Sequence, residues 1–527
     1  MNFKYDPNEE KLIVQDSTRI EYHQLNLWLT RHVKGYRFMP AFKMGVWNGQ
    51  QSYFDNGKVS LGLWRECLKA CKEIDVTFNI DNKDEFPLNR DVTLESVQEF
   101  CDDFFKDHKM KDRTTGEWIP FKPYDYQIET AYKILKNRYC MAEVATSGGK
   151  SLVISILIFY TLKNIDPDAK FLIIVPSINL VTQFTDNIYE YFFGFQNSNV
   201  NLSDDNNLIR IEEIMSDKPR KFFTKNNPNI FVGCYQSLEK YPKEFFEQFH
   251  TVACDEAHGA KATTLTTILK RTFKHAYNRF GVSGTFPSDD SLEILTIQSV
   301  LGPNVTKIEA KKLVESGTIT PMNIKAVILN HATSDLNERL SYIKKMGAGA
   351  DAFRYEKEFV QQSDKRLDFI KKLIDKCDSN TLLLFHTIEY GTRIYEKLRS
   401  EISNKDFYYI DGEINNKQRE FIKKEMEKTD GNVKVLVASY GTLSTGVSIN
   451  AIFNVVFADS FKSEQIIIQS IGRALRKHND KQVATIFDLV DVFDTKEMNN
   501  ILYKHFLERE KFYKKREYPY KVIRMNL

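Results

Sequence analysis

Residues 144–159 read VATSGGKSLVISILIF, a glycine-rich turn that runs directly into a long apolar segment. A turn of this kind at the start of a helix points several backbone N–H groups at one spot, and the helix dipole adds positive potential there. The pattern predicts a cradle for nucleotide phosphates, in which Lys150 reaches the β- and γ-phosphates and the Ser151 hydroxyl binds Mg²⁺. Val144 stands where the strict G-x-x-x-x-G-K-[ST] pattern has its first glycine. The residues expected to contact the nucleotide are Thr146, Ser147, Gly148, Gly149, Lys150 and Ser151.

A second motif follows downstream, where residues 251–258 read TVACDEAH. An apolar strand that ends in two adjacent carboxylates places them at the carboxyl edge of a parallel sheet, where ligands of such sheets bind. We expect Asp255 to hold the Mg²⁺ of the nucleotide, and Glu256 to orient and deprotonate the attacking water. The alternative is a surface acidic pair that caps the next helix, and the phosphate-binding turn upstream argues against it.

A third motif, QSIGRALRK at residues 469–477, lies in the last fifth of the chain. In a helix, Gln469, Arg473 and Arg476 share one face through their i, i+4, i+7 spacing. A guanidinium that reaches the γ-phosphate stabilises charge developing in the transition state, an effect worth ~10³–10⁵ in rate in related phosphoryl transferases. A surface helix with salt-bridged arginines fits this motif equally well by itself, but the order of the three motifs favours catalytic arginines.

Short apolar runs alternate with amphipathic, helix-like segments from about residue 125 onward. This alternation is typical of parallel sheets wound with crossover helices. We therefore predict an α/β protein with two parallel-sheet lobes, at residues 111–310 and 311–500, between a small α+β domain at 1–110 and a basic tail at 501–527. The runs interpreted as buried strands are 171–175, 230–232, 251–254, 381–385, 433–437 and 455–458.

The composition is that of a globular protein, with 28% charged and 42% hydrophobic residues and a net charge of +3 over 527 residues. These values exclude a disordered or fibrous chain. The N-terminus has no signal-peptide pattern, and the most apolar stretch, residues 152–162, is shorter than the ~18 residues that a membrane span needs. Seven cysteines fit neither a disulfide framework nor a paired zinc site. We expect a soluble protein of a reducing compartment, the cytoplasm, with no membrane and no metal beyond Mg²⁺.

Two segments are basic and also rich in aromatic residues: residues 31–70 and the last 27 residues of the chain. Basic residues interleaved with rings suit a phosphate backbone whose bases stack on the rings. A solvated basic face over core aromatics is the alternative. Within the first segment, Arg37 and Lys43 are the candidates for nucleic-acid contacts.

Taken in order, these motifs resemble those of the superfamily two helicases and translocases with a D-E-A-H box, over about residues 120–490. Two departures from the family pattern are the missing arginine before the YDYQ motif and the SGT triplet where S-A-T is usual. The further segments that carry the resemblance are YDYQ (124–127), VPS (175–177), GCYQSL (233–238), SGT (283–285), LFH (384–386) and ASYGTLSTGVS (438–448).

The resemblance implies two RecA-like lobes that close on ATP and Mg²⁺ and open after hydrolysis, while both grip one nucleic-acid strand. It also implies that Gln127 reads the adenine and that Gly446 contacts the nucleotide. Contacts to the phosphate backbone carry little sequence information, so structure-specific binding is expected. The residues implied to contact nucleic acid are Pro176, Ser177, Gln183, Gln236, Ser237, His386, Ser439 and Thr442.

Residues 35–49, GYRFMPAFKMGVWNG, resemble the N-terminal domain of bacteriophage recombination and repair helicases. This resemblance implies an enzyme, working as a monomer in the host cytoplasm, that unwinds or branch-migrates forked and four-way DNA. Single strands, RNA–DNA hybrids and other phage recombination and replication proteins are the further partners that it implies.

Three other functions remain open. The first is an RNA helicase, or a translocase that remodels complexes without separating strands, because the D-E-A-H box does not distinguish DNA from RNA. The second is a nucleic-acid-binding scaffold with an inactive ATPase, against which the complete set of Lys150, Asp255, Glu256, Arg473 and Arg476 argues. The third is the motor of a restriction system, against which the lack of a nuclease-like cluster outside the lobes argues.

Overall fold

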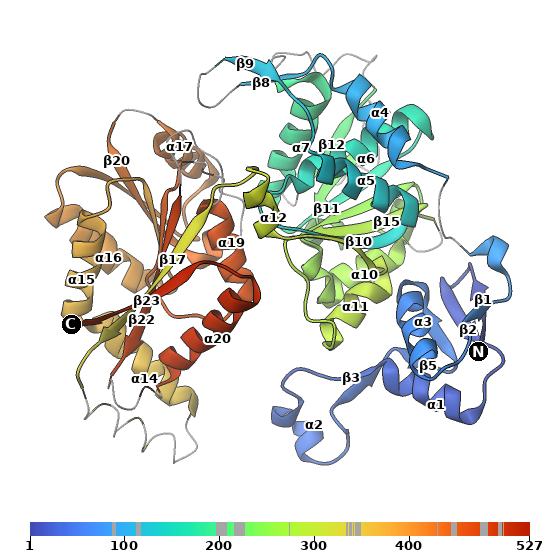
Figure 1. Ribbon diagram of the computed structural model, residues 1–527, viewed down its shortest axis with the longest axis horizontal. Coiled ribbons are helices and arrows are strands. Elements are labelled where there is room, and N and C mark those ends of the chain that lie inside the picture. The colour runs from blue at the N-terminus through green and yellow to red at the C-terminus, as the bar shows by residue number, and fades with distance from the viewer. Residues whose placement is uncertain are drawn as a thin grey trace. The chain divides into compact units, whose positions relative to one another are not determined.

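Two seven-stranded sheets, in which every strand is parallel to its neighbours, form the framework of the chain (Figure 1). The computed structural model divides into unit 1, Met1–Ala145 with Gly149–Glu309, and unit 2, Thr146–Gly148 with Ala310–Leu527. These sheets and their helices confirm the predicted α/β class with two RecA-like lobes. The structure describes residues 1–86, 91–111, 117–195, 208–215, 227–272, 275–333, 336, 340, 342, 349–428, 431–443, 449, 451–474, 483–493, 498 and 500–527.

The sheet of the first lobe has the order β12-β13-β11-β14-β15-β10-β16. Its central strands are almost wholly apolar because helices cover both faces, as is usual for parallel sheets. Along β11, Phe171, Ile173 and Val175 pack on one face while Leu172 and Ile174 pack on the other. The strands are β10 (Tyr139–Val144), β11 (Phe171–Val175), β12 (Ile211–Ile214), β13 (Ile230–Cys234), β14 (Thr251–Asp255), β15 (Asn278–Ser283) and β16 (Asn304–Ile308).

Helices α4 to α7 cover one face of this sheet, and α8 to α11 cover the other. Helix α6 is buried from Leu152 to Leu162 on every side, which explains why its sequence is apolar throughout rather than amphipathic. A short hairpin, β8 (Lys109–Lys111) and β9 (Trp118–Pro120), precedes α5. The helices are α4 (Leu94–Phe104), α5 (Asp125–Asn137), α6 (Lys150–Asn164), α7 (Ile178–Phe193), α8 (Tyr235–Leu238), α9 (Lys243–Phe246), α10 (Thr263–Arg271) and α11 (Leu292–Leu301).

The N-terminal part of unit 1 is a small α+β domain, as predicted. Its sheet, β5-β6-β2-β1-β7, is antiparallel except for the pairing of β1 with β7. Helix α1 begins at a capping box formed by Thr18 and Glu21. The elements are β1 (Asn2–Asp6), β2 (Lys11–Val14), α1 (Arg19–Trp28), β3 (Thr30–His32), α2 (Pro40–Lys43), β4 (Gln50–Ser52), β5 (Phe54–Asp55), β6 (Lys58–Ser60), α3 (Trp64–Glu73) and β7 (Asn79–Ile80).

This domain shares one hydrophobic core with the first lobe, on the α11 face of the sheet. Glu10 and Arg279 form an ion pair across the junction, at 2.5 and 3.3 Å, and each is 2% exposed. Arg279 also donates to the Val300 carbonyl at 2.6 Å and lies over the Tyr139 ring. Helix α4, which the sequence analysis placed in the N-terminal domain, instead packs Val97 and its neighbours into the core of the first lobe.

The sheet of the second lobe has the order β19-β20-β18-β21-β22-β17-β23. Its strands are β17 (Met322–Asn330), β18 (Thr381–Phe385), β19 (Lys405–Ile410), β20 (Val433–Ser439), β21 (Asn454–Phe457), β22 (Ala484–Val492) and β23 (Tyr520–Asn526). Its helices are α12 (Ala310–Glu315), α14 (Gly349–Gln362), α15 (Asp364–Asp375), α16 (Ile388–Glu401), α17 (Asn416–Glu427), α18 (Tyr440–Leu443), α19 (Glu464–Ala474) and α20 (Ile501–Lys515).

The prediction of a separate basic tail at residues 501–527 is wrong. These residues form α20 and β23, and β23 adds a strand in parallel register to β17. Helix α20 buries Phe506, Phe512 and Tyr513, while the lysines that made the segment look like a tail lie on its exposed side. Arg509 is buried and binds Asp488 on β22 through two hydrogen bonds, at 2.9 and 2.8 Å. Among the described residues, no helix is both long and apolar enough to span a membrane.

The Glu10–Arg279 pair gives a direct test of how firmly the N-terminal domain is attached. Replacing Glu10 with alanine removes the carboxylate that pairs with the buried guanidinium, so the free energy of unfolding should fall by about 3–5 kcal/mol. The matched control is Glu9→Ala, because Glu9 makes only exposed ion pairs, with Lys11 and Lys58, and should lose less than about 1 kcal/mol. Urea denaturation measures both variants, and equal losses would contradict a structural role for the buried pair.

Candidate active site

The phosphate-binding turn joins β10 to α6, as the sequence predicts. Ser147 and Gly149 both adopt left-handed backbone conformations, with φ of 67° and 77°. Gly149 is the N-cap of α6 and no side chain caps this end of the helix, so the first turn presents its backbone N–H groups outward. A Cβ at Gly149 would lie 2.2 Å from Nε2 of Gln127, so a larger residue at this position would have to displace the Gln127 side chain.

Gln127 therefore lies against the turn, although the two segments are distant in sequence. Its side chain is 4% exposed on α5, and its Oε1 accepts a hydrogen bond from the Tyr124 backbone N–H at 2.9 Å. The structure thus brings the YDYQ segment to the phosphate-binding turn. Ser151, in the first turn of α6, has its Oγ 3.4 Å from the Tyr191 hydroxyl.

The acidic pair lies at the carboxyl end of β14. Asp255 is the last residue of the strand, and Glu256 follows it with a φ of 48° in the left-handed region. Backbone strain of this kind clusters at functional sites. The Glu256 N–H donates to Oδ1 of Asp255 at 2.9 Å, and Lys150 Nζ lies 2.8 Å from Oε1 of Glu256. Lys150 and Glu256 thus meet in a half-buried ion pair.

The two adjacent carboxyls have opposite pKa shifts. Burial and, after it, the negative charge of Glu256 raise the pKa of Asp255 to about 6. Burial opposes the charge on Glu256 too, but Lys150 and His258 hold its pKa below the ordinary value. Near neutral pH, Glu256 is therefore ionised, in the form that a general base needs.

A hydrogen-bonded network continues from Glu256 to the SGT motif. His258 Nδ1 is 2.9 Å from the Ser283 hydroxyl and 3.3 Å from Oε2 of Glu256. Ser283 is the last residue of β15; its hydroxyl donates to the Thr285 carbonyl at 2.8 Å and lies 3.4 Å from Glu256. The acidic motif and the SGT motif are thus connected through side chains on neighbouring strands.

The sheet order explains why these motifs converge. Strands β13, β11, β14, β15 and β10 are successive neighbours, and each ends at the same carboxyl edge. The segments that follow them are the GCYQSL motif, the VPS motif, the D-E-A-H box, the SGT motif and the phosphate-binding turn. Motifs that are separate in the sequence therefore lie side by side along the carboxyl edge of the sheet, where parallel sheets bind ligands.

Five predicted nucleic-acid contacts follow strands β11 and β13 in unit 1, and their side chains differ in exposure. Gln236 is exposed on α8, and Gln183 is half-buried on α7. Ser177, at the N-terminus of α7 next to Pro176, has a buried hydroxyl with no hydrogen-bond partner. Ser237 is 3% exposed, and its hydroxyl faces the Cys234 sulfur at 3.2 Å, so its side chain points away from the surface.

In unit 2, His386 follows β18 and Ser439 ends the adjacent strand β20. The backbone N–H of His386 donates to Asp459 Oδ2 at 2.7 Å. Thr442 lies in α18, but its side chain is outside the described residues, as is that of Arg473 in α19. Gly446 and Arg476 lie outside the described residues altogether, so the structure tests neither arginine.

Two residues of this region were missed in the sequence. Asp459 is 3% exposed and accepts from both His386 and Gln361, so it fixes the end of β18. It directly follows an apolar strand, as Asp255 does, and that pattern was the available signal. Thr387 has a buried hydroxyl without a partner at the start of α16, matching Ser177 at the start of α7.

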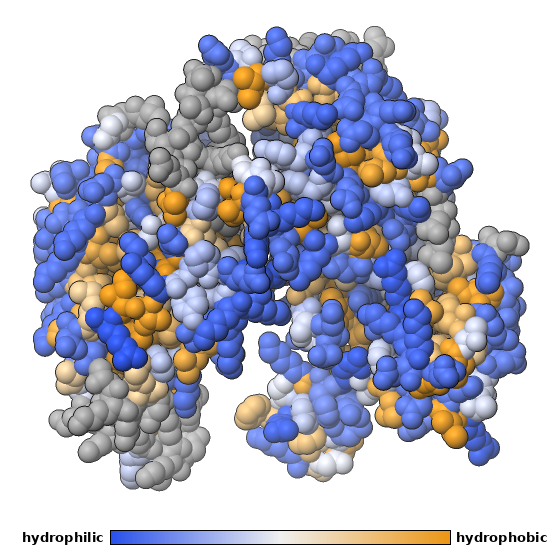
Figure 2. Space-filling model, viewed as in Figure 1, coloured by the Kyte–Doolittle hydropathy of each residue, from blue (hydrophilic) through white to orange (hydrophobic). Residues whose placement is uncertain are grey.

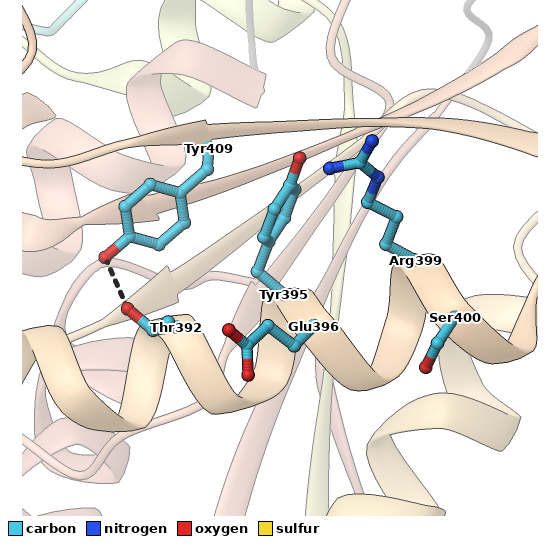
Figure 3. Close-up of a pocket in the computed structure, with 6 residues that line it drawn as sticks. All are labelled: Thr392, Tyr395, Glu396, Arg399, Ser400 and Tyr409. Carbon is cyan, nitrogen blue, oxygen red and sulfur yellow. Dashed lines mark hydrogen bonds between the residues drawn. The ribbon is translucent and has the colours of Figure 1, made fainter.

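The cavity on α16 and β19 is a separate feature of unit 2 (Figure 3). It measures about 530 Å³, and within it the Thr392 and Tyr409 hydroxyls approach to 3.5 Å. Its lining contains none of the predicted site residues. The lining residues are Thr392, Tyr395, Glu396, Arg399, Ser400 and Tyr409.

Comparisons with known proteins agree with this geometry. Residues 120–288 match the family model of the type III restriction enzyme res subunit, residues 365–478 the helicase conserved C-terminal domain, and residues 10–81 the N-terminal domain of DNA helicase UvsW. The ATP-dependent DNA helicase uvsW of Enterobacteria phage T4 is 28% identical over 537 residues, covering 99% of each chain. The chain is homologous to this DNA helicase, which agrees with the superfamily two motifs of its sequence.

Solved structures support the helicase fold alone. The type ISP restriction-modification enzyme LlaBIII bound to DNA matches with a TM-score of 0.56 and 14% identity, over 78% of this chain and 32% of that one. S. cerevisiae Dbp5 bound to RNA and ADP BeF3 matches with a TM-score of 0.51 and 16% identity, over 77% and 90%. The superfamily two assignment confirms the resemblance found in the sequence motifs.

Contact between Gly149 and Gln127 predicts that this helicase is sensitive to a single methyl group in the turn. Gly149→Ala should weaken nucleotide binding at least tenfold, because the Cβ displaces Gln127 and the left-handed backbone is strained. Titration with a fluorescent ATP analogue measures the affinity. Gly412→Ala is the matched control, since no atom lies within 4 Å of a Cβ there, and equal weakening by both variants would contradict the assignment.

Proposed function

We propose that this chain hydrolyses ATP to unwind or branch-migrate forked and junction DNA. The observation that carries the proposal is the network Lys150–Glu256–His258–Ser283 at the carboxyl edge of the first sheet. The network links Lys150, which would bind the γ-phosphate, to Glu256, which would activate water. It then continues to Ser283 on the neighbouring strand β15. The likeness to the phage T4 relative, an ATP-dependent DNA helicase, supports DNA as the substrate.

In this proposal the phosphates of ATP occupy the N-terminus of α6. Their negative charge competes with Glu256 for Lys150, which frees the Glu256 carboxylate to accept a proton from the attacking water. Ser151 and Asp255 would hold Mg²⁺, partly through water, because hydroxyl and carboxylate oxygens are the ligands that this ion prefers. Bound there, Mg²⁺ would neutralise charge on the phosphates.

Arg473 and Arg476 complete the proposed catalytic set. Each guanidinium would stabilise charge on the γ-phosphate in the transition state. Gln127 would read the adenine from its place beside Gly149, and Gly446 would contact the nucleotide. These four assignments rest on the family motifs.

The DNA strand would lie along the carboxyl edges of both sheets. The unpartnered hydroxyl of Ser177 suits a phosphate oxygen, and Pro176, Gln183 and Gln236 surround that region of unit 1. Ser237 would act only through its backbone, because its side chain points inward. In unit 2, His386, Ser439 and Thr442 would contact the same strand, and Arg37 and Lys43 would contact duplex near the branch. Because contacts of this kind go to the DNA backbone, they select DNA by its branched structure rather than by its base sequence.

The biological setting belongs to the same proposal. We place the enzyme in the cytoplasm of a phage-infected bacterium, as a monomer that acts on forks, four-way junctions, single strands and RNA–DNA hybrids. Phage recombination and replication proteins are the expected partners. DNA recombination and repair are the processes that need such an activity.

A second candidate function is the motor of a restriction system. The family model that matches residues 120–288 and the fold likeness to LlaBIII favour it. The match of residues 10–81 to the UvsW N-terminal model, with the end-to-end alignment to the phage helicase, favours the junction helicase. Cleavage of duplex DNA in the presence of ATP would support the restriction motor.

The test is ATP hydrolysis with forked DNA, linear duplex, single-stranded DNA and single-stranded RNA of equal length. Forked DNA should stimulate most, and Glu256→Gln should lower hydrolysis at least 100-fold while ATP binding persists, because only the base is removed. Glu244→Gln, on an exposed position of the same lobe, is the control that should keep full activity.

Three results would contradict the proposal. Stimulation by RNA alone would support the RNA-helicase alternative, and no hydrolysis with any nucleic acid would leave a binding protein. Fork-stimulated hydrolysis without strand separation would support a remodelling translocase.

A further inference from the structure

The segment between β3 and β4, residues 33–49, forms a small folded projection that we call the tip (Figure 1). At its base the ring of Tyr36 stacks on that of His32 in β3 at 4.3 Å, and within the tip Tyr36 meets Phe42 edge-on at 4.8 Å. Gly49 lies directly against the Tyr36 ring, where a Cβ would come within 2.2 Å of the ring. The Tyr36 ring thus packs against both ends of the tip.

Three apolar side chains on this tip point into solvent. Phe38 is 80% exposed, Val46 is 73% exposed and Met44 is 69% exposed. Figure 2 shows apolar surface at the end of the projection, among hydrophilic groups. Single exposed apolar residues are ordinary, but three within nine residues on one projection indicate a contact surface.

The charge around these side chains is entirely positive. Residues 22–54 contain no Asp or Glu, and they carry four Lys and Arg residues. Those four are Arg31, Lys34, Arg37 and Lys43. Apolar groups surrounded by cations alone are complementary to nucleic acid, whose phosphates bind the cations and whose bases stack on the apolar groups.

The base of the tip is fixed to the first lobe. Leu29 precedes β3 and is wholly buried, and its carbonyl accepts from the Tyr53 N–H at 3.0 Å. The Tyr53 hydroxyl donates to the Thr296 hydroxyl on α11 at 2.6 Å. The tip therefore belongs to the same unit as Lys150 and Glu256.

We propose that the tip is a strand-separating wedge, whose Phe38, Met44 and Val46 side chains insert against the last base pair at a DNA branch. Proteins unstack base steps with apolar wedges of this kind, and the bases gain an apolar surface in place of the lost stacking. The cations of the tip hold the phosphates of the branch arms while the motor draws one strand away. This inference rests on the proposed helicase function and assigns the residues that open the duplex.

The test replaces Phe38, Met44 and Val46 together with serine in the full chain. All three are exposed, so folding should be unaffected, and circular dichroism checks this. Unwinding of forked DNA should fall at least tenfold, while ATP hydrolysis stimulated by single-stranded DNA stays within twofold. Phe38→Trp alone should keep unwinding, because it retains a ring that stacks.

The controls are Ile20→Ser on α1 and Phe421→Ser on α17, two exposed apolar positions outside the tip that should unwind normally. A second measurement places 2-aminopurine in the last base pair of the branch. Its fluorescence should rise when the unaltered chain binds without ATP, and the triple variant should leave it unchanged.

Two results would overturn the wedge. Normal unwinding by the triple variant is the first. The second is an unchanged base fluorescence together with tip-dependent binding to anionic vesicles or to a protein. Failure of the proposed helicase function can be distinguished from failure of the wedge. If the chain is not a helicase, the unaltered chain shows no DNA-stimulated ATP hydrolysis, but the fluorescence measurement still tests the wedge.

Discussion

The ion pair between Lys150 and Glu256 is the interaction on which the site depends. It joins the first turn of α6 to the end of β14, two strands away from β10 in the sheet. The backbone on both sides is strained, at Ser147 and at Glu256, and such positions cost about 1–3 kcal/mol each. Helix α6, buried on every side from Leu152 to Leu162, and strand β14, whose first four residues are buried, hold this strained geometry in place.

Buried ion pairs connect the outer elements of each unit to the central sheet of that unit. Glu10 with Arg279 attaches the N-terminal domain to β15, and Arg509 with Asp488 attaches α20 to β22. Arg366 on α15 binds Asp491 on β22, and this guanidinium with His331 lowers the pKa of the buried Asp491 to about 2, against the effect of burial. A buried ion pair adds little stability compared with a pair of apolar side chains in the same place, but removal of one of its partners is strongly destabilising. These ion pairs therefore favour one arrangement of the helices and strands.

Much of the fold could be predicted because parallel sheets have continuous apolar strands. The runs at 171–175 and 381–385 coincide with β11 and β18. β23 was missed because it is a largely exposed edge strand in which polar and basic residues interrupt the apolar ones. The sequence also gave no signal for the pairing of Glu10 with Arg279, since that contact depends on how the N-terminal domain packs.

The parts of the site that could be predicted are those in which the residue types of one short motif are enough to indicate the chemistry. The phosphate-binding turn and the acidic pair are defined by local residue types, and the structure brings Lys150 and Glu256 together. The contact of Gln127 with Gly149 could not be predicted, because it depends on the packing of α5 against the turn. The inward orientation of the Ser237 side chain could not be predicted either, because nothing in the sequence marks its partner, Cys234, as different from other buried strand residues.

In the proposed mechanism, the Glu256–His258–Ser283 network would pass the state of ATP from the first sheet to the DNA. The most direct test is the number of base pairs unwound per ATP hydrolysed, compared between the unaltered chain and Ser283→Ala. Ser291→Ala, which removes only the cap of α11, is the control. The account predicts that this ratio falls at least tenfold in Ser283→Ala while DNA-stimulated hydrolysis stays within threefold of the unaltered chain. An unchanged ratio would show that the network does not couple hydrolysis to strand separation.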